Sequence, residues 1–271
     1  MSRALTVLIL VVASAVGLVA FLYPFVVPAA LTAGGSMGLA HAADAPLLFV
    51  LLVVLCLGAV VSSLSAGTLN TKLVAVLGVL AALNAVLRLV PGPAGFNAVF
   101  ALPVLAGYAY GPTFGFLLGA LSLLVSAFLG GGVGPWLPFQ MFATGWVGLT
   151  SAWLPRLQRW PRAEIVMLAA WAGALGFLFG ALMNVWFWPY VFSGAQPGQY
   201  WEPGLGLADT LQRYAVFYLT TSLWWDLGRA AGNVLLVGLF GWPVLRLLRR
   251  FGRRFYFQLA LPHTAPPGGE G

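Results

Sequence analysis

A few charged and polar side chains, set among long apolar runs, could bind a small organic molecule. Arg88 precedes the turn Pro91-Gly92-Pro93, and Asp226 and Arg229 stand three residues apart, so they can pair on one helix face. Amide and tryptophan side chains are expected near the same end of their segments: Asn97, Gln140, Asn184, Asn233, Trp136 and Trp188. Aromatic walls with a few placed polar groups are typical of a ligand pocket. These residues form our predicted substrate-binding site, open to the exterior.

The same residues also have a structural explanation. Charges near helix ends can reach the lipid–water interface or neutralise one another, and tryptophan belts are common in membrane proteins. Amides are more informative, because an apolar medium offers them no hydrogen-bond partner. The glycine-rich run 130–134 before Pro135 and Trp136 predicts irregular backbone, which membranes tolerate where it lines a cavity. We interpret this loop as a substrate lid, with a flexible turn as the alternative.

Other chemistries find no support in the sequence. A Walker A motif is absent, so we do not expect the chain to hydrolyse ATP. Cys56 is the single cysteine, and His41 and His263 fall in a polar loop and in the tail, so we expect neither a metal site nor catalysis. The pI near 10.1 could indicate nucleic-acid binding, but the positive charges sit at the ends of apolar segments.

Composition indicates a membrane protein. Charged residues make up 7% of the 271 residues and hydrophobic residues 61%, with a mean hydropathy of +0.95. We expect eight apolar segments, at about 4–30, 46–66, 72–90, 97–111, 113–130, 137–154, 163–189 and within 210–249. They are continuously apolar rather than alternating, which favours helices over barrel strands. The first is too long for a signal-peptide core, so we expect it to stay in the protein as a helix despite the cleavage-like Ala40-His41-Ala42.

The charge pattern predicts the orientation. Basic residues cluster at Arg3, at Lys72, at 156–162 and at 246–254, and an even number of crossings puts all of them on one side. The positive-inside rule makes that side cytoplasmic, with both termini there. The last segment is too long for one crossing, so Asp209 to Thr221 is predicted to form an external helix before it.

Small residues recur in the third segment. Gly78 and Ala82, and Ala81 and Ala85, form two interleaved pairs at four-residue spacing, which allow close helix approach. The pairs could pack within the bundle or form a docking face for another membrane protein.

Three stretches resemble the substrate-specific (S) components of energy-coupling factor (ECF) transporters. They are 81–88 (AALNAVLR), 107–116 (GYAYGPTFGF) and 134–141 (GPWLPFQM). The resemblance covers about 70–250 and implies an all-α integral membrane protein of the prokaryotic plasma membrane. A six-helix substrate-binding core at 67–255 would follow an additional transmembrane pair at 1–66, and a disordered cytoplasmic tail at 256–271 would end the chain.

The resemblance also implies partners and a ligand. An S component captures a vitamin with its external loops, here 91–96 and 131–139, and docks on a transmembrane coupling protein driven by two ATPases. Ala81 and Ala85 match the family's docking motif for that coupling protein. The chain looks most similar to the subgroup linked to cobalamin or related corrinoids. Alternatives are another vitamin, a queuosine-type precursor, a stand-alone secondary transporter or channel and, least, an intramembrane enzyme or assembly factor.

Overall fold

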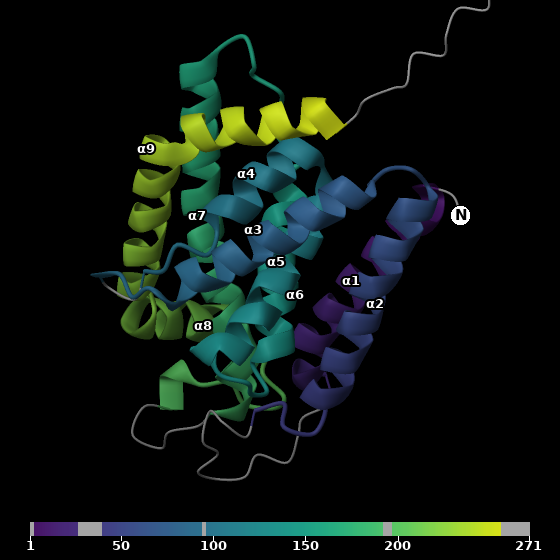
Figure 1. Ribbon diagram of the computed structural model, residues 1–271. Helices are drawn as coiled ribbons and strands as arrows, with labels where there is room; N and C mark the ends of the chain where they lie inside the picture. The colour runs from purple at the N-terminus through teal and green to yellow at the C-terminus, as the bar shows by residue number, and fades with distance from the viewer. Residues whose placement is uncertain (1–2, 27–39, 94–95, 192–196, 256–271) are drawn as a thin grey trace, which may run out of the picture.

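The structure is a computed structural model that describes residues 3–26, 40–93, 96–191 and 197–255. This part of the chain forms nine α-helices (Figure 1). They are α1 (Arg3–Leu22), α2 (Ala45–Ser65), α3 (Thr71–Leu89), α4 (Ala101–Tyr110), α5 (Pro112–Ser126), α6 (Leu137–Ser151), α7 (Pro161–Phe187), α8 (Leu207–Thr221) and α9 (Leu223–Phe255). Short 3-10 turns follow α1 and α7, and a π-turn (Ala127–Gly131) follows α5. The all-helical prediction is confirmed.

Six of these helices are long and apolar enough to cross a membrane: α1, α2, α3, α5 with its π-turn, α7 and α9. The other two predicted crossings are shorter. At 1.5 Å per residue, the 10 residues of α4 span about 15 Å, half of a hydrocarbon core. Residues 97–100, which were expected to be helical, are not part of the helix, and the described residues 90–93 and 96 before them are not α-helical either. Eight crossings therefore stay a prediction.

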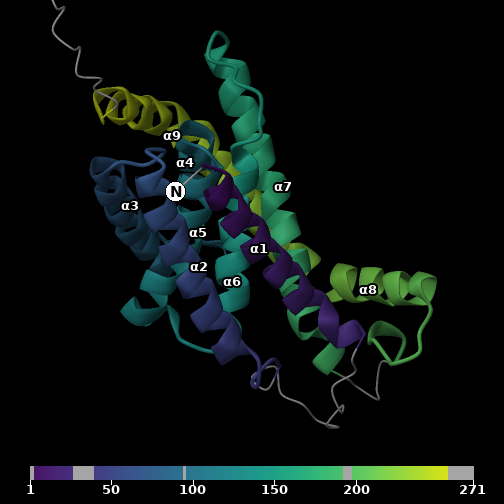
Figure 2. The same cartoon turned by 90° about the vertical axis from the view of Figure 1, so that its right-hand side faces the viewer.

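The core of the bundle is built on α5 and α6, with α3 and α4 packed against them and α7 paired with α9 (Figures 1 and 2). α1 and α2 form a hairpin on one side, which packs mainly on α6. Trp146 Nε1 on α6 donates a hydrogen bond to Ser14 Oγ on α1 (3.1 Å), and Phe21 meets Phe139 edge to face. The helices of the predicted additional pair thus share a core with the rest, although the division at residue 66 stays a prediction.

The basic segments lie at one end of the bundle. The start of α1, the start of α3, the loop before α7 and the end of α9 meet there (Figure 1). Arg88, Arg213 and Arg229 are the exceptions, at or near the other end. This arrangement agrees with the charge pattern expected of a cytoplasmic side. We call the two ends the basic end and the mouth.

α8 and α9 explain the long last apolar segment. The predicted helix over Asp209 to Thr221 is confirmed as α8, which extends sideways from the bundle at the mouth (Figure 2). α9 then runs to the basic end and bends, so that its last turns lie across the end of the bundle (Figure 1), and it contains Pro243. Proline removes a helical hydrogen bond and clashes with the preceding turn, which accounts for the bend.

Glycines set the spacing of α4, α5 and α6. A Cβ at Gly148 would lie 2.8 Å from the Cα of Gly115, and one at Gly107 would meet the backbone of Gly148. Helix backbones therefore touch where these residues cross, as small residues permit in membranes. Gly111, the single residue between α4 and α5, has φ of 101°, a conformation that disfavours other residues.

Some predictions fall on residues that the structure does not describe. They are the disordered tail at 256–271, the end of the first segment at 27–30, the first part of the following loop at 31–39, and two residues of the predicted external loop 91–96, at 94–95.

Replacing Gly148 by valine is expected to destabilise the bundle, by about 1–3 kcal/mol or more, because the added side chain meets backbone that cannot move aside. The measurement is the apparent melting temperature in detergent. Gly238→Val on α9 is the matched control, since a Cβ there meets nothing within 4 Å. Equal melting temperatures for both variants would contradict this packing.

Candidate functional site

The mouth of the bundle holds the predicted site residues, which the structure brings together as two polar groups. The first group centres on Arg88, in the last turn of α3. Its Nη1 donates to Ser126 Oγ (2.7 Å) and its Nη2 to Gln140 Oε1 (2.8 Å). One guanidinium thus joins α3, α5 and α6. We call Arg88, Ser126 and Gln140 the Arg88 group.

The Arg88 group includes a cation with no acidic partner within the described ranges. Arginine has five N–H donors in a planar fork, and its neighbours here are neutral acceptors. The charge itself is left uncompensated in a half-buried position. Such a group can bind an anionic or strongly polar part of a ligand.

The glycine-rich loop passes directly over this cation. A Cβ at Gly131 would collide with Arg88 Nη1, and Gly130 and Gly132 have φ of 126° and 83°. Trp136 is half-buried just beyond, with its ring against Gly134. The predicted lid loop therefore lies against the predicted Arg88 site, and its glycines are required for close approach and for positive φ. The role of this loop as a substrate lid stays a prediction.

The second group joins α7, α8 and α9 around Asp226. The carboxylate is buried and paired with Arg229 one turn later, as the spacing predicts. Tyr218 donates its hydroxyl to Asp226 Oδ2 (2.8 Å), and Gly180 on α7 leaves the space that the carboxylate fills. Burial raises the pKa of the Tyr218 hydroxyl, and its bond to Asp226 adds to the effect, so it stays a donor at neutral pH. We call these residues the Asp226 group.

Two of the predicted amides border the Asp226 group. Asn184 Nδ2 donates to Ser222 Oγ (2.7 Å), just before α9 begins. Asn233 is fully buried, and its Nδ2 donates to Arg229 O (3.0 Å). Its Oδ1 has no hydrogen-bond partner in the described part of the protein. A buried amide oxygen without a partner is unfavourable and marks a position where a ligand or water can donate.

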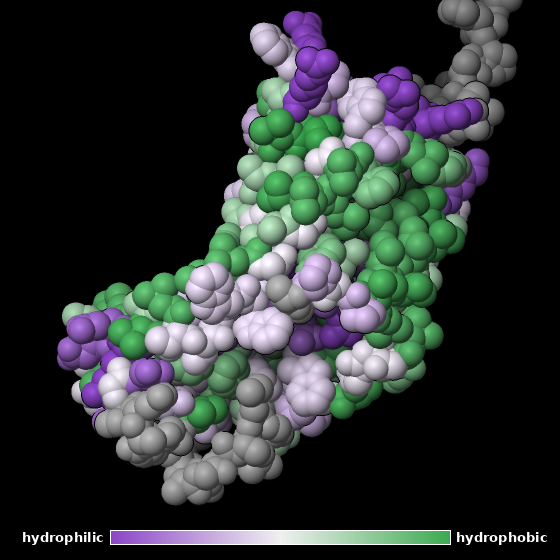
Figure 3. All heavy atoms as spheres, turned by 90° about the vertical axis from the view of Figure 1, so that its left-hand side faces the viewer, coloured by the Kyte–Doolittle hydropathy of each residue, from purple (hydrophilic) through white to green (hydrophobic). Residues whose placement is uncertain are grey.

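Residues 96–100 pack on α7 and α9, close to the Asp226 group in the sequence of α9. Asn97 lies in this segment, half-buried. Phe96 packs over Gly232 on α9, and Phe100 lies against Phe179 on α7 with ring centroids 4.9 Å apart. No hydrogen bond between described residues joins the Arg88 group to the Asp226 group. On the face that carries α9 and α8, hydrophilic atoms lie on the floor of a hollow between the apolar bundle and the arm that α8 forms (Figure 3).

Trp188 lies apart from both groups. It is 1% exposed, its Nε1 donates to Gln199 O (3.0 Å), and it packs on Phe217 and Trp201. Together with Leu22, Phe25 and Tyr214 it lines an apolar pocket of about 580 Å³ between α1, α7 and α8. Of the nine predicted site residues, six thus lie in or beside the two polar groups and Trp188 lines an adjoining aromatic pocket, while Trp136 follows the glycine-rich loop and Asn97 lies in the segment 96–100.

Sequence reasoning missed two polar networks. His41 was expected in a polar loop, yet it is 2% exposed. Its Nδ1 lies 2.8 Å from Asp44 Oδ2 and its Nε2 3.0 Å from Trp186 O, within a ring of aromatic side chains from α6 and α7. The three-residue spacing of His41 and Asp44 was the one signal in the sequence that the two side chains could pair. That spacing does not indicate that His41 is buried.

The second missed network lies at the basic end. Glu164 on α7 is fully buried and accepts two hydrogen bonds from Arg249 on α9, at 2.9 and 2.6 Å. Tyr108 on α4 donates to the same carboxylate (2.7 Å). A lone acidic residue beside basic loops carries little signal in a sequence. This network fastens α4, α7 and α9 together, away from the mouth.

The small-residue pairs of α3 face in different directions. Ala81 and Ala85 are 3% and 0% exposed and pack within the bundle, whereas Gly78 and Ala82 are exposed. Val79 and Val86 extend the same exposed face. The predicted docking pair therefore faces the bundle and the interleaved pair beside it faces outward, and the docking role of Ala81 and Ala85 stays a prediction.

A comparison of the sequence with models of known protein families gives a match. Residues 72–240, well over half of the chain, match the family described as "ECF transporter, substrate-specific component". The chain belongs to this family. S components are non-enzymatic binding subunits, multi-pass proteins of the prokaryotic cell membrane, and they associate with a coupling protein and ATPases. The predicted S-component function and localisation are confirmed at this level. No curated protein and no solved structure shows a significant match.

The match begins at the second residue of α3 and ends before Pro243. It includes the Arg88 and Asp226 groups and leaves out α1, α2 and the bent end of α9. Nothing in the match distinguishes the cobalamin-linked subgroup.

The Asp226–Arg229 pair is expected to stabilise the S component. Asp226→Asn would leave the Arg229 guanidinium, 21% exposed, without its carboxylate, at a cost of about 3 kcal/mol. The measurement is the melting temperature in detergent. The neutral double variant Asp226→Asn/Arg229→Gln should regain part of the loss, because it leaves no uncompensated charge. A single variant as stable as the parent would show that the pair contributes nothing.

Proposed function

We propose that this S component captures a vitamin-like micronutrient from outside the cell at its mouth and delivers it through an ATP-driven complex. The observation that carries the proposal is the uncompensated Arg88 cation beneath a glycine-rich loop, inside the stretch that matches the family. Arg88, Gln140 and Trp136 would bind one part of the ligand. Asp226, Arg229, Asn184 and Asn233 would bind another, with Asn97 between them and Trp188 in the adjoining aromatic wall.

Cobalamin or a related corrinoid is the leading candidate for the ligand. This choice rests on the overall likeness of the sequence to the cobalamin-linked subgroup. The chemistry of the site is compatible with such a ligand. The Arg88 cation, which has no acidic partner among the described residues, could bind a phosphate, and the unpartnered Asn233 Oδ1 could accept a hydrogen bond from an amide of the ligand. A flat heteroaromatic vitamin or a queuosine-type precursor would meet the same groups.

Binding should depend on Arg88 and on Trp136, which follows the glycine-rich loop over it. Arg88→Ala and Trp136→Ala are each expected to weaken the affinity at least about tenfold, by removing a charge-assisted hydrogen bond or an aromatic wall. The ligand is first identified by mass spectrometry of small molecules that copurify with the chain, and affinities are then measured by calorimetry with that compound. A cobalt-containing chromophore would identify a corrinoid.

Two matched controls separate binding from folding. Arg213→Ala removes an arginine from α8, and Trp224→Ala removes a tryptophan that is 73% exposed. Both should bind as the parent does, and every variant should still be expressed and folded at the temperature of the binding measurement. Unchanged affinity in both Arg88→Ala and Trp136→Ala would place the ligand elsewhere.

We also propose that the exposed face of α3 docks on the coupling protein. The N-terminal hairpin packs mainly on α6, which leaves the α3 face with Gly78, Val79, Ala82 and Val86 accessible. Small residues there would let a partner helix approach closely. The family resemblance implies the same role for the small residues Ala81 and Ala85.

Gly78→Leu/Ala82→Leu is therefore expected to abolish ATP-dependent uptake in vesicles that contain the coupling protein and ATPases, while ligand affinity is unchanged. Ala81→Leu/Ala85→Leu, on the buried side of the helix, should instead lower the melting temperature. Uptake at parent levels by the Gly78/Ala82 variant would refute the docking face. Gradient-driven accumulation by the chain alone would favour the rival function of a secondary transporter.

A further inference from the structure

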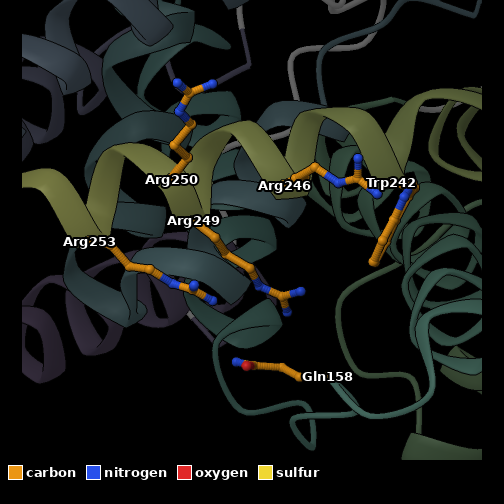
Figure 4. A pocket seen from close by; sticks show the side chains of 6 residues that line it. All are labelled: Gln158, Trp242, Arg246, Arg249, Arg250 and Arg253. Carbon is orange, nitrogen blue, oxygen red and sulfur yellow. The ribbon is translucent and has the colours of Figure 1, made fainter.

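The bent end of α9 forms a positively charged pocket at the basic end, far from the mouth. The pocket has a volume of about 380 Å³ and is lined by Gln158, Trp242, Arg246, Arg249, Arg250 and Arg253 (Figure 4). Its four arginines come from consecutive turns of one helix, at 246, 249, 250 and 253, and Gln158 faces them from the loop before α7. The positive-inside rule explains why arginines are at this end, but not why they line a hollow.

One of the four arginines is held in place by the fold. Arg249 makes the two hydrogen bonds to Glu164 described above, so its charge is compensated and its position fixed. Arg246 stacks on the Trp242 ring, with its guanidinium carbon 5.0 Å from the ring centroid.

Arg250 and Arg253 are exposed and, like Arg246, have no acidic partner in the part of the chain that is described. In Figure 4 the side chains of Arg249 and Arg253 extend from the helix toward Gln158, and Arg246 lies beside Trp242. Arg250 leaves the helix on the other side. The pocket therefore carries a net positive charge around a fixed Arg249–Glu164 pair, and suits an anion with several oxygen acceptors.

The surroundings of the pocket are those of a membrane interface. Beyond Pro243 the helix lies across the end of the bundle with Leu245 and Leu248 buried beneath it. Leu247 and Phe251 are 49% and 37% exposed on the same turns. The loop that carries Gln158 exposes Trp153 and Trp160, at 71% and 69%. Basic residues beside exposed apolar and tryptophan side chains are typical of a helix in the headgroup region.

We propose that this pocket binds the phosphodiester headgroup of an anionic phospholipid, in the leaflet that the charge pattern assigns to the cytoplasm. Guanidinium groups of Arg246 and Arg253 bind the phosphate oxygens, and the Gln158 amide binds the polar head beyond it. The acyl chains lie along the exposed apolar side chains of the bent helix. A soluble phosphate shares the same chemistry but gains nothing from those side chains. The inference does not rest on the proposed vitamin or on the site at the mouth.

Native mass spectrometry of the full chain, stripped of lipid and titrated in detergent, tests the proposal. Phosphatidylglycerol is expected to bind at least about tenfold more tightly than phosphatidylcholine. Arg246→Gln/Arg253→Gln should lower the affinity for phosphatidylglycerol about tenfold. Arg159→Gln/Arg162→Gln is the matched control, because it removes two exposed arginines nearby, one from the loop before α7 and one from the first turn of α7, and neither lines the pocket. It should change the affinity by less than about twofold.

Each other outcome would overturn the proposal. Equal losses in the two double variants would mean that overall charge, and not the pocket, attracts the lipid. Protection by inorganic phosphate equal to that by phosphatidylglycerol, measured as a shift in melting temperature, would identify a soluble anion instead. Unchanged lipid binding together with lost association with the coupling protein would make the arginines a protein interface.

Discussion

Hydrocarbon offers no hydrogen-bond partner, so polar groups within this bundle are stable mainly where other groups of the protein meet them, with Asn233 Oδ1 as an exception. That constraint decides where the helices touch. Arg88 on α3 donates to acceptors on α5 and α6. Asp226 pairs with the Arg229 cation on its own helix and accepts a hydrogen bond from Tyr218 on α8. Glu164 does the same for α4, α7 and α9 at the opposite end. The apolar side chains fill the space, and these few polar contacts fix which faces meet.

The N-terminal hairpin obeys the same constraint. Thr6 and Ser62 share a hydrogen bond of 2.9 Å between α1 and α2, and Ser14 accepts one from Trp146 on the core. At the mouth, His41 joins the segment before α2 to α6 and α7. Its ring packs on Phe139, and its Nε2 lies 3.0 Å from the backbone oxygen of Trp186. Residues outside the family match are therefore joined to residues inside it by specific polar contacts. The hairpin is a structural part of the mouth as well as an additional pair of helices.

The sequence predicts the helices and the polarity of the ends well, because continuous apolar runs and clustered arginines are properties of the chain itself. It also predicts α8, because the last apolar stretch exceeds one crossing. Individual contacts are harder. The pairing of Asp226 with Arg229 follows from helical spacing, but that of Arg88 with Gln140 depends on how α3 and α6 are placed. Ala81 and Ala82 look equivalent in the sequence, yet a rotation of one residue buries the first and exposes the second.

The segment between α3 and α4 differs from the rest of the bundle in how its backbone is satisfied. A regular helix would have to break several ladder bonds in order to unwind. Here Asn84 Nδ2 holds the carbonyl of Val99 (3.0 Å), and the backbone of Gly92 and Phe96 closes a short turn (2.8 Å). The position of the Phe96 ring over Gly232 on α9 therefore depends on a few side-chain and turn hydrogen bonds, whereas each long helix is held by a continuous hydrogen-bond ladder.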